Sequence, residues 1–174
     1  HLFALIDLAA KNEIKNLKIH IFTDGKDSGL KEAPALIKKL QNYITEKGFG
    51  SIATIIGRDF AMDRDNNWAY TKKAYDLMVR GDGETTSDVI NKIEEIYSFG
   101  ITDSKLPPLI TDKQGLIKEN DSLIFFNFRE DSMRQLARSF VEHGFNIFPI
   151  EQFKNLFVVV MTQYLVNSLN VAFP

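Results

Sequence analysis

Two helix-then-strand units open the sequence and constrain the fold more than any other feature. In residues 2–12 apolar side chains recur at helical spacing, and residues 17–24 change to a bulky, β-branched pattern that ends at the turn DGKD. A second amphipathic stretch, 31–47, ends at Gly48, and the β-rich run SIATIIG follows at 51–57. This alternation predicts an α/β fold: a three-layer sandwich with a mostly parallel or mixed central sheet and helices on both faces.

The rest of the chain continues the alternation with one interruption. We predict helices over 68–79, 89–97 and 132–142, with Thr86 or Ser87 capping the second, a central strand over 123–128, and a last buried strand over 156–162. Pro107-Pro108 breaks the pattern, so residues 101–120 are expected to form a hairpin or flap. Residues 165–174 lack periodicity and are expected to be a linker. At 174 residues the chain is expected to be a single domain.

Composition excludes several classes of function. Lys and Arg number 21 against 23 Asp and Glu, so no basic field exists to hold nucleic acid or an anionic membrane. The absence of cysteine excludes disulfides, thiolate nucleophiles and Cys-type zinc sites. The longest apolar run, LFVVVM, is far shorter than the roughly 20 residues that span a bilayer. The opening HLFALIDLAA is typical of an internal segment rather than a signal peptide. We therefore expect a cytoplasmic protein without nucleic-acid or membrane partners.

Cations follow three of the predicted strands. In open α/β sheets ligands bind beyond the carboxyl ends of the strands, so these positions indicate an anion site. The residues are Lys26 and Asp27 in FTDGKD, Arg58 in IIGRD, Arg129 in FNFRED, and Arg64 in AMDRD. Together they could hold the charge of about −2 that a phosphate group carries, with Asp27 and Asp63 orienting the cations or binding hydroxyls. The alternative, that any one of these charges merely solvates a loop, stays open.

Other chemistry is not visible in the sequence. No Ser-His-Asp order, HExxH pair or metal-type carboxylate cluster stands out, so an autonomous hydrolase or metalloenzyme is not supported. His20 lies within the first strand, where a core or sheet-face histidine is favoured over a catalytic base.

Five segments, in order along nearly the whole chain, resemble one enzyme family. They are HLFALIDLAAK, FTDGKD, ATIIGRDFAMDRDNNWAYTKKAYD, IFFNFRED and VVVMTQY, and they are similar to cofactor-independent phosphoglycerate mutases, with Asp59 replacing an aromatic residue of the family pattern. The resemblance implies two α/β domains. One is phosphatase-like and carries two manganese ions and a serine nucleophile. The other is an inserted transferase domain that holds the glycerate, and residues 1–174 look like this insert alone.

The resemblance also implies a reaction and a set of contacts. The full-length enzyme would interconvert 3-phosphoglycerate and 2-phosphoglycerate without 2,3-bisphosphoglycerate, as a monomer. Substrate contacts would fall at Asp27, Arg58, Arg64 and Arg129, with Lys26 in place of a family arginine and Ser132 where a second arginine is usual. No catalytic residue and no metal ligand would lie in this fragment, which we expect to be inactive without its missing phosphatase-like domain.

Two other classes of function compete with this interpretation. The same cations could form a non-catalytic binding module for a small phosphorylated or carboxylated metabolite. They could also form only surface salt bridges in a structural or protein-interaction domain.

Overall fold

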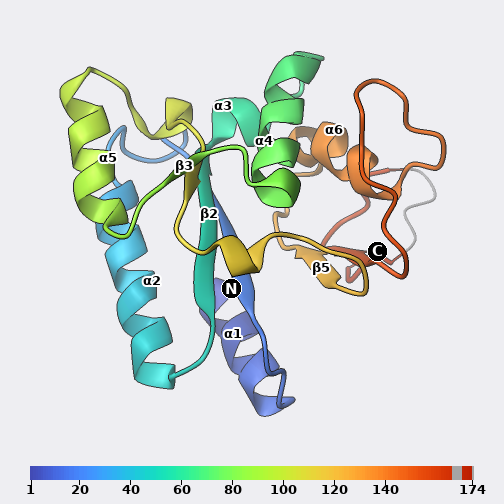
Figure 1. Cartoon of the computed structure of the whole chain (residues 1–174), viewed down its shortest axis with the longest axis horizontal. Coiled ribbons are helices and arrows are strands. Elements are labelled where there is room, and N and C mark those ends of the chain that lie inside the picture. The colour runs from blue at the N-terminus through green and yellow to red at the C-terminus, as the bar shows by residue number, and fades with distance from the viewer. Residues whose placement is uncertain (166–169, 174) are drawn as a thin grey trace.

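A mixed four-stranded sheet forms the centre of the computed structural model, which describes residues 1–165 and 170–173 (Figure 1). Its strand order is β1-β2-β4-β3, with bounds β1 (Lys18–Thr23), β2 (Ser51–Gly57), β4 (Leu109–Ile110) and β3 (Glu84–Thr85). Strand β1 pairs with β2 in parallel, β4 is antiparallel to β2, and β3 is parallel to β4. The predicted α/β class with a mixed sheet is confirmed.

Apart from the short α3, which the sequence pattern did not predict, the helices begin and end close to the predicted ranges. They are α1 (Leu2–Lys11), α2 (Ala33–Lys47), α3 (Arg58–Ala61), α4 (Trp68–Arg80), α5 (Val89–Ser98) and α6 (Glu130–Val141), with 3-10 turns η1 (Asp103–Lys105) and η2 (Lys113–Gly115). Gly48 ends α2 at φ 62°, a left-handed conformation that favours glycine. The predicted cap of α5 is wrong: Asp88 caps this helix, because its carboxylate accepts from the backbone N–H of Asn91. None of these helices is long and apolar enough to cross a membrane, as judged over the described residues.

Helices cover both faces of the central sheet. In Figure 1, α2 and α5 lie on one side of β2, and α3, α4 and α6 lie on the other. Each side has its own apolar core. The first is built on Ile37, Leu40 and Ile93 from α2 and α5, and the second on Leu77 and Leu136 from α4 and α6.

An extra residue in β2 lets this strand serve both cores. Ile19 of β1 lies opposite Ile52, but His20 lies opposite Thr54, so Ala53 has no counterpart on β1. One added residue reverses the alternation of side chains along a strand. Ile52 and Ile55 therefore both join the core under α2 and α5, while Ile56 joins the opposite one.

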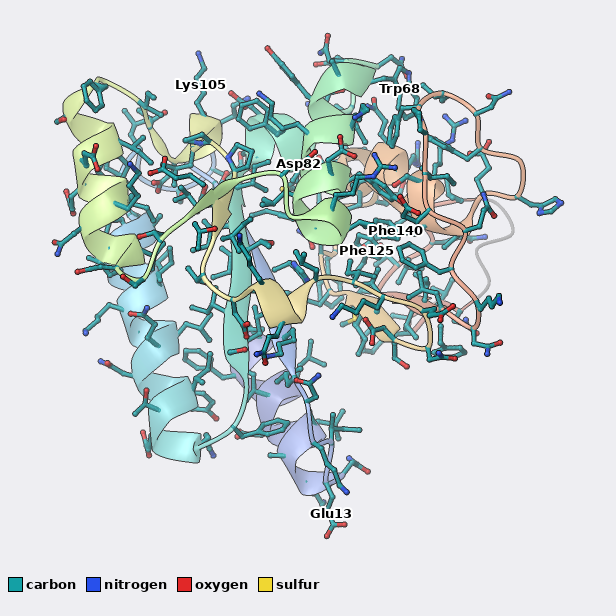
Figure 2. The ribbon with its side chains drawn as sticks, in the orientation of Figure 1. Glu13, Trp68, Asp82, Lys105, Phe125 and Phe140 are labelled. Carbon is teal, nitrogen blue, oxygen red and sulfur yellow. The ribbon has the colours of Figure 1, made fainter. Side chains whose placement is uncertain are left out.

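The strand expected at 123–128 does not lie in the central sheet. It is β5 (Ser122–Phe125), and it pairs in parallel with β6 (Phe157–Val160) to form a separate two-stranded sheet. Its apolar run is equally compatible with a central or a satellite strand, because periodicity does not reveal the pairing partner. Phe125 anchors this second sheet to α6, with ring centroids 5.8 Å from Phe140 (Figure 2).

Residues 101–120, expected as a hairpin or flap, contribute to the centre of the fold. They supply β4, which lies between β2 and β3, and they supply η1. The linker expected over 165–174 lies partly outside the described residues; within it, Val171 forms a β-bridge with Val160.

The carboxylate of Asp103 in η1 joins three elements. It is 2% exposed, and Oδ2 accepts from the backbone N–H groups of Glu32 and Ala33 at 2.8 and 3.0 Å, which caps α2. Its Oδ1 accepts from the hydroxyl of Tyr97 on α5, and its backbone carbonyl accepts from Thr23 Oγ1 at the end of β1. One buried residue, through its carboxylate and its backbone carbonyl, thus fixes α2 and α5 to the sheet edge where β1 ends.

Replacing Asp103 with alanine should lower the free energy of unfolding by about 2–4 kcal/mol, because two backbone donors and one hydroxyl lose a buried acceptor. Urea denaturation followed by circular dichroism measures this change. The exposed Asp82, replaced in the same way, is the control and should shift stability by less than about 0.5 kcal/mol. Equal effects of the two substitutions would contradict the capping role.

A second prediction concerns His20, whose Nδ1 lies 2.8 Å from Thr54 Oγ1. Burial lowers the pKa of His20 to about 4, against an ordinary value of 6.5. Between these values the unfolded chain binds the proton more readily, so stability is full above about pH 6.5 and falls as the pH drops towards 4. We expect a loss of about 2–2.5 kcal/mol between pH 7 and pH 4.5. Urea denaturation of a His20→Gln variant should show a shallower pH dependence, and an unchanged dependence would contradict this assignment.

Candidate functional site

Parallel pairing places the ends of β1 and β2 side by side. Thr23, the last residue of β1, lies opposite Gly57, the last residue of β2. The DGKD loop therefore leaves the sheet next to Arg58, which begins α3. The 3-10 turn η1 lies directly against both loops, and glycine makes this approach possible. A Cβ on Gly25 would lie 2.8 Å from Ser104 N, and a Cβ on Gly57 would lie 2.4 Å from Ser104 O.

Arg58 is the most deeply placed cation of this edge. Its side chain is 10% exposed, and Nη1 donates to Asp24 Oδ1 and, at 2.8 Å, to Asp27 Oδ2. Asp24 Oδ1 also accepts from the backbone N–H groups of Lys26 and Asp27 at 3.3 and 3.4 Å. The loop after β1 is therefore closed around the guanidinium that follows β2.

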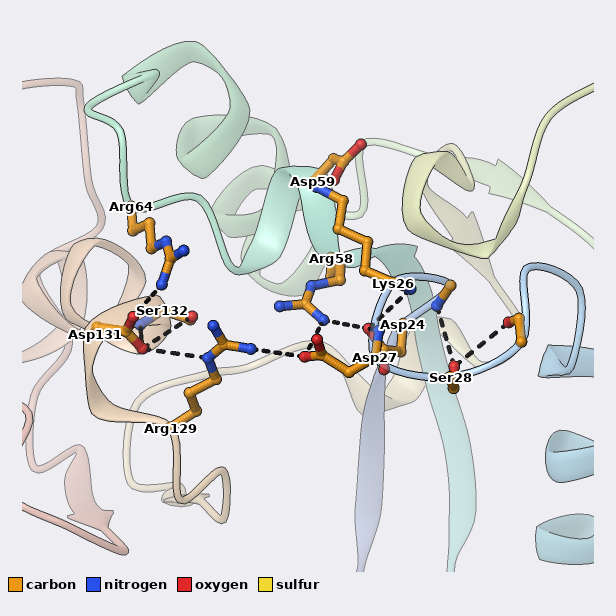
Figure 3. A network of polar contacts seen from close by, with 12 residues as sticks. Asp24, Lys26, Asp27, Ser28, Arg58, Asp59, Arg64, Arg129, Asp131 and Ser132 are labelled. Atoms are coloured by element: carbon orange, nitrogen blue, oxygen red, sulfur yellow. Dashed lines mark hydrogen bonds and ion pairs between the residues drawn. The ribbon is translucent and has the colours of Figure 1, made fainter.

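Further ion pairs extend from Asp27 across to α6 (Figure 3). Asp27 Oδ2 is 2.6 Å from Arg129 Nη1, Arg129 Nε is 3.5 Å from Asp131 Oδ1, and Asp131 pairs with Arg64. We call the resulting line of alternating charges the arginine–aspartate row: Asp24, Arg58, Asp27, Arg129, Asp131 and Arg64. It joins residues of four loop or helix segments that are up to 107 positions apart, from Asp24 to Asp131.

The five predicted site residues thus lie in one region of the molecule. Asp27, Arg58, Arg64 and Arg129 are members of the row, whereas Lys26 pairs with Asp59 at 2.5 Å. Asp63 does not orient a cation as expected; it accepts instead from Asn67 and Gln135. This correction reflects its burial, which turns its side chain towards α6 rather than towards solvent.

Sequence reasoning overlooked the carboxylates that hold the cations. Asp24 and Asp131 are members of the row, yet neither was singled out. A signal was present, because each lies within two residues of a predicted cation, in FTDGKD and FRED. Arg134, two residues after Ser132, does not join the row: it donates to Glu130 and to the carbonyl of Tyr164.

The electrostatics of the row allow an anion to bind. Among the described residues, the hydrogen bonds of Arg58, Arg64 and Arg129 leave Nη2 of each without a partner. A guanidinium has five N–H donors, so each can keep its aspartate and still bind an oxyanion. Asp27 is 64% exposed, and so the row faces solvent at its middle.

The charge of the row is balanced before any ligand arrives. Its three arginines face three aspartates, and beside the row Lys26 pairs with Asp59. The hydrogen bond from Arg58, with the charges of Arg58 and Arg129, holds the pKa of Asp27 below its usual range, so this carboxylate is ionised at neutral pH. Binding must therefore come from local donors rather than from excess positive charge.

Metal-ligand clusters and cavities are the other features that bear on a ligand site. Over the described residues, no group of three or more His, Asp or Glu side chains could hold a metal ion. A cavity of about 360 Å³ lies between α1, α2, β1 and residues 126–127, and its lining is mostly apolar. None of its lining residues belongs to the row, and so the cavity does not extend the anion site.

With a mixed sheet covered on both faces and paired arginines and aspartates at the strand exits, the chain has an α/β fold with a charged edge. It belongs to the family described as "BPG-independent PGAM N-terminus", which matches residues 1–166. The family expected from the sequence motifs is thereby confirmed.

Individual relatives agree with this membership. The chain is 43% identical over 181 residues to a 2,3-bisphosphoglycerate-independent phosphoglycerate mutase 1 of Methanosarcina barkeri, which covers 100% of this chain and 35% of the relative. It is 41% identical over 167 residues to a 2,3-bisphosphoglycerate-independent phosphoglycerate mutase of Pyropia yezoensis, covering 94% of this chain and 31% of the relative. The chain thus spans about a third of the length of the curated relatives it matches.

A solved structure shares the fold. The crystal structure of Leishmania mexicana phosphoglycerate mutase at low cobalt concentration superposes with a TM-score of 0.84 at 23% identity, covering 94% of this chain and 32% of that one. At this identity the likeness supports the fold alone.

The pKa of Asp27 provides a test of the row's geometry. Replacing Arg58 with glutamine should raise this pKa towards its ordinary value of 3.8, because the largest lowering influence is lost, and Arg129→Gln should raise it less. Carboxyl-carbon NMR titration measures both shifts. Asp112, whose pKa is lowered mainly by Lys18, is the internal control and should not move. An Asp27 titration that both substitutions leave unchanged would show that the row does not form in solution.

Proposed function

We propose that the full-length protein interconverts 3-phosphoglycerate and 2-phosphoglycerate without 2,3-bisphosphoglycerate, and that this chain is its substrate-binding transferase domain. The observation that carries the proposal is the free Nη2 edge on three clustered arginines, in a chain of the BPG-independent family. The names of the relatives support the same reaction. We also expect a monomer in the cytoplasm.

In this proposal the row holds the glycerate while the phosphoryl group is bound to the serine of the second domain. Arg58, Arg64 and Arg129 neutralise the carboxylate and the phosphoryl oxygens, which is the electrostatic and positioning work that dominates phosphoryl transfer. Lys26 adds a fourth, more exposed cation, and Asp27 accepts a hydrogen bond from a glycerate hydroxyl. Each anchored arginine presents its donors in a fixed place, so less side-chain entropy is lost on binding.

The nucleophile in this proposal is a serine outside residues 1–174. The phosphoryl group leaves the 3-oxygen of the substrate for the serine oxygen, and then leaves the serine for the 2-oxygen of the retained glycerate. Two manganese ions would belong to that second domain. The carboxylates of the row do not fit a metal ion, because each already accepts from an arginine.

Aromatic residues near both ends of the chain lie against the residue that precedes Arg129. Phe128, which precedes Arg129, has its ring 5.5 Å from the ring of His1 and 5.9 Å from that of Phe173. Polypeptide preceding His1 or following Phe173 would therefore start close to Phe128, the neighbour of Arg129 in the row. We propose that residues 165–174 form the connection to the phosphatase-like domain, which would close over the row and exclude water.

Kinetics of the full-length enzyme test this function. Arg58→Gln and Arg129→Gln should each lower kcat/KM for 3-phosphoglycerate by about 100-fold, because a charge-assisted hydrogen bond contributes about 1.5–3 kcal/mol. Arg134→Gln is the matched control: it removes the same charge from α6, but Arg134 pairs with Glu130 outside the row. We expect its kcat/KM to stay within about two-fold of the parent, a range typical of surface changes.

Two results would overturn the proposal. Full-length protein that neither converts 3-phosphoglycerate nor binds it in a calorimetric titration would reduce the row to surface ion pairs. Equal losses in all three arginine variants would show that the effect is one of net charge rather than of the row.

A further inference from the structure

A buried amide connects α6 to the loop that carries Arg64. Gln135 of α6 is 5% exposed. Its Nε2 donates to Asp63 Oδ2 at 2.8 Å and to Thr71 Oγ1 at 2.9 Å, and its Oε1 accepts from the backbone N–H of Asn66 at 2.8 Å. Both amide hydrogens and the carbonyl are therefore used.

These bonds fix the loop on both sides of Arg64. Asp63, which precedes Arg64, also accepts from the backbone and side-chain nitrogens of Asn67 at 2.8 and 2.9 Å. Asn66, two residues after Arg64, adopts φ 63°, a left-handed conformation that its bond to Gln135 helps to hold. The loop cannot move relative to α6 without breaking buried hydrogen bonds.

The same helix carries the other half of the row. Arg129 is the N-cap of α6, and Asp131 lies in its first turn, four positions before Gln135 and so on the same face. Asp131 faces Arg64 while Gln135 faces Asp63 and Asn66. One helix face therefore contacts the loop twice, once through an exposed ion pair and once through a buried amide.

The buried contact is the stronger of the two. Arg64 and Asp131 are 50% and 40% exposed, and ion pairs of this kind contribute little because solvent screens them. A satisfied buried amide is different, since breaking it leaves unpaired polar groups in the interior. The relative position of Arg64 and Arg129 thus depends on Gln135 rather than on the ion pair.

We propose that Gln135 is a positioning residue for substrate binding, whose buried amide sets the spacing between Arg64 and Arg129 across the row. This inference rests on the proposed function, because it assumes that both arginines contact the phosphoglycerate. Gln135 itself does not contact the substrate; it holds the loop and α6 at the separation that the anion requires.

The Gln135→Glu variant of the full-length enzyme tests the proposal. The new carboxylate loses both amide donors and repels Asp63, so α6 and the loop should separate. We expect KM for 3-phosphoglycerate at pH 8 to rise at least ten-fold, with kcat changed less. Two carboxylates this close share a proton as the pH falls, which restores one hydrogen bond. The ratio of variant KM to parent KM should therefore fall between pH 8 and pH 5.5.

Three comparison variants separate positioning from stability and charge. Gln152→Glu makes the same charge change at an exposed position, and Leu40→Ala destabilises the core under α2 and α5, away from the row. Both should keep the parent KM at every pH. Thr71→Val removes one partner of Gln135 without adding charge, and KM should rise about two- to five-fold. This variant serves as the test if Gln135→Glu does not fold.

The outcomes distinguish this inference from the proposed function. If the parent enzyme is inactive, the proposed function fails. If the parent is active and either Gln135→Glu keeps the parent KM or Leu40→Ala raises it equally, the positioning role is overturned. A KM ratio that does not change with pH would also overturn it, because the repulsion from Asp63 would then not be the cause.

Discussion

The parallel pairing of β1 with β2 is the constraint on which the rest of this structure depends. Parallel strands end at the same edge of a sheet, and so the residues that follow them must converge. Here the convergence brings Arg58 against the loop that contains Asp24 and Asp27. Neither strand alone could build the site, because Arg58 follows β2 whereas the two aspartates that hold it follow β1.

Alternation of positive and negative side chains allows three arginines to lie close together at one edge of the sheet. Three arginines close together would repel one another, and in the row an aspartate lies between successive arginines. Each contact uses only part of a guanidinium, and free donors remain on Nη2. The arrangement is balanced in charge without a ligand, and it still leaves N–H donors that an anion could use.

Buried polar groups hold this exposed row in place. Asp103 fixes the start of α2 behind the loop of Asp27, and Gln135 fixes the loop of Arg64 to α6. Exposed ion pairs are too weak to define such geometry, whereas satisfied buried hydrogen bonds are costly to break. The precision of the site therefore comes from residues that need not touch a ligand.

Local pattern in the sequence determined the helices, the first two strands and the position of the cations. The run 51–57 is a strand because its β-branched residues suit a pleated, buried surface, and α2 ends at Gly48 because glycine adopts a positive φ at little cost. The motifs around Arg58 and Arg129 also identified the family.

Only the tertiary structure decided which strands pair and which side chains meet. The run at 123–128 became part of a second sheet, residues 101–120 supplied β4, and Asp63 turned to Gln135 rather than to a cation. Periodicity reports how deeply a segment is buried, but not its neighbours. Contacts such as Asp103 with Ala33, 70 residues apart, form only when packing brings distant segments together, and no local pattern encodes that choice.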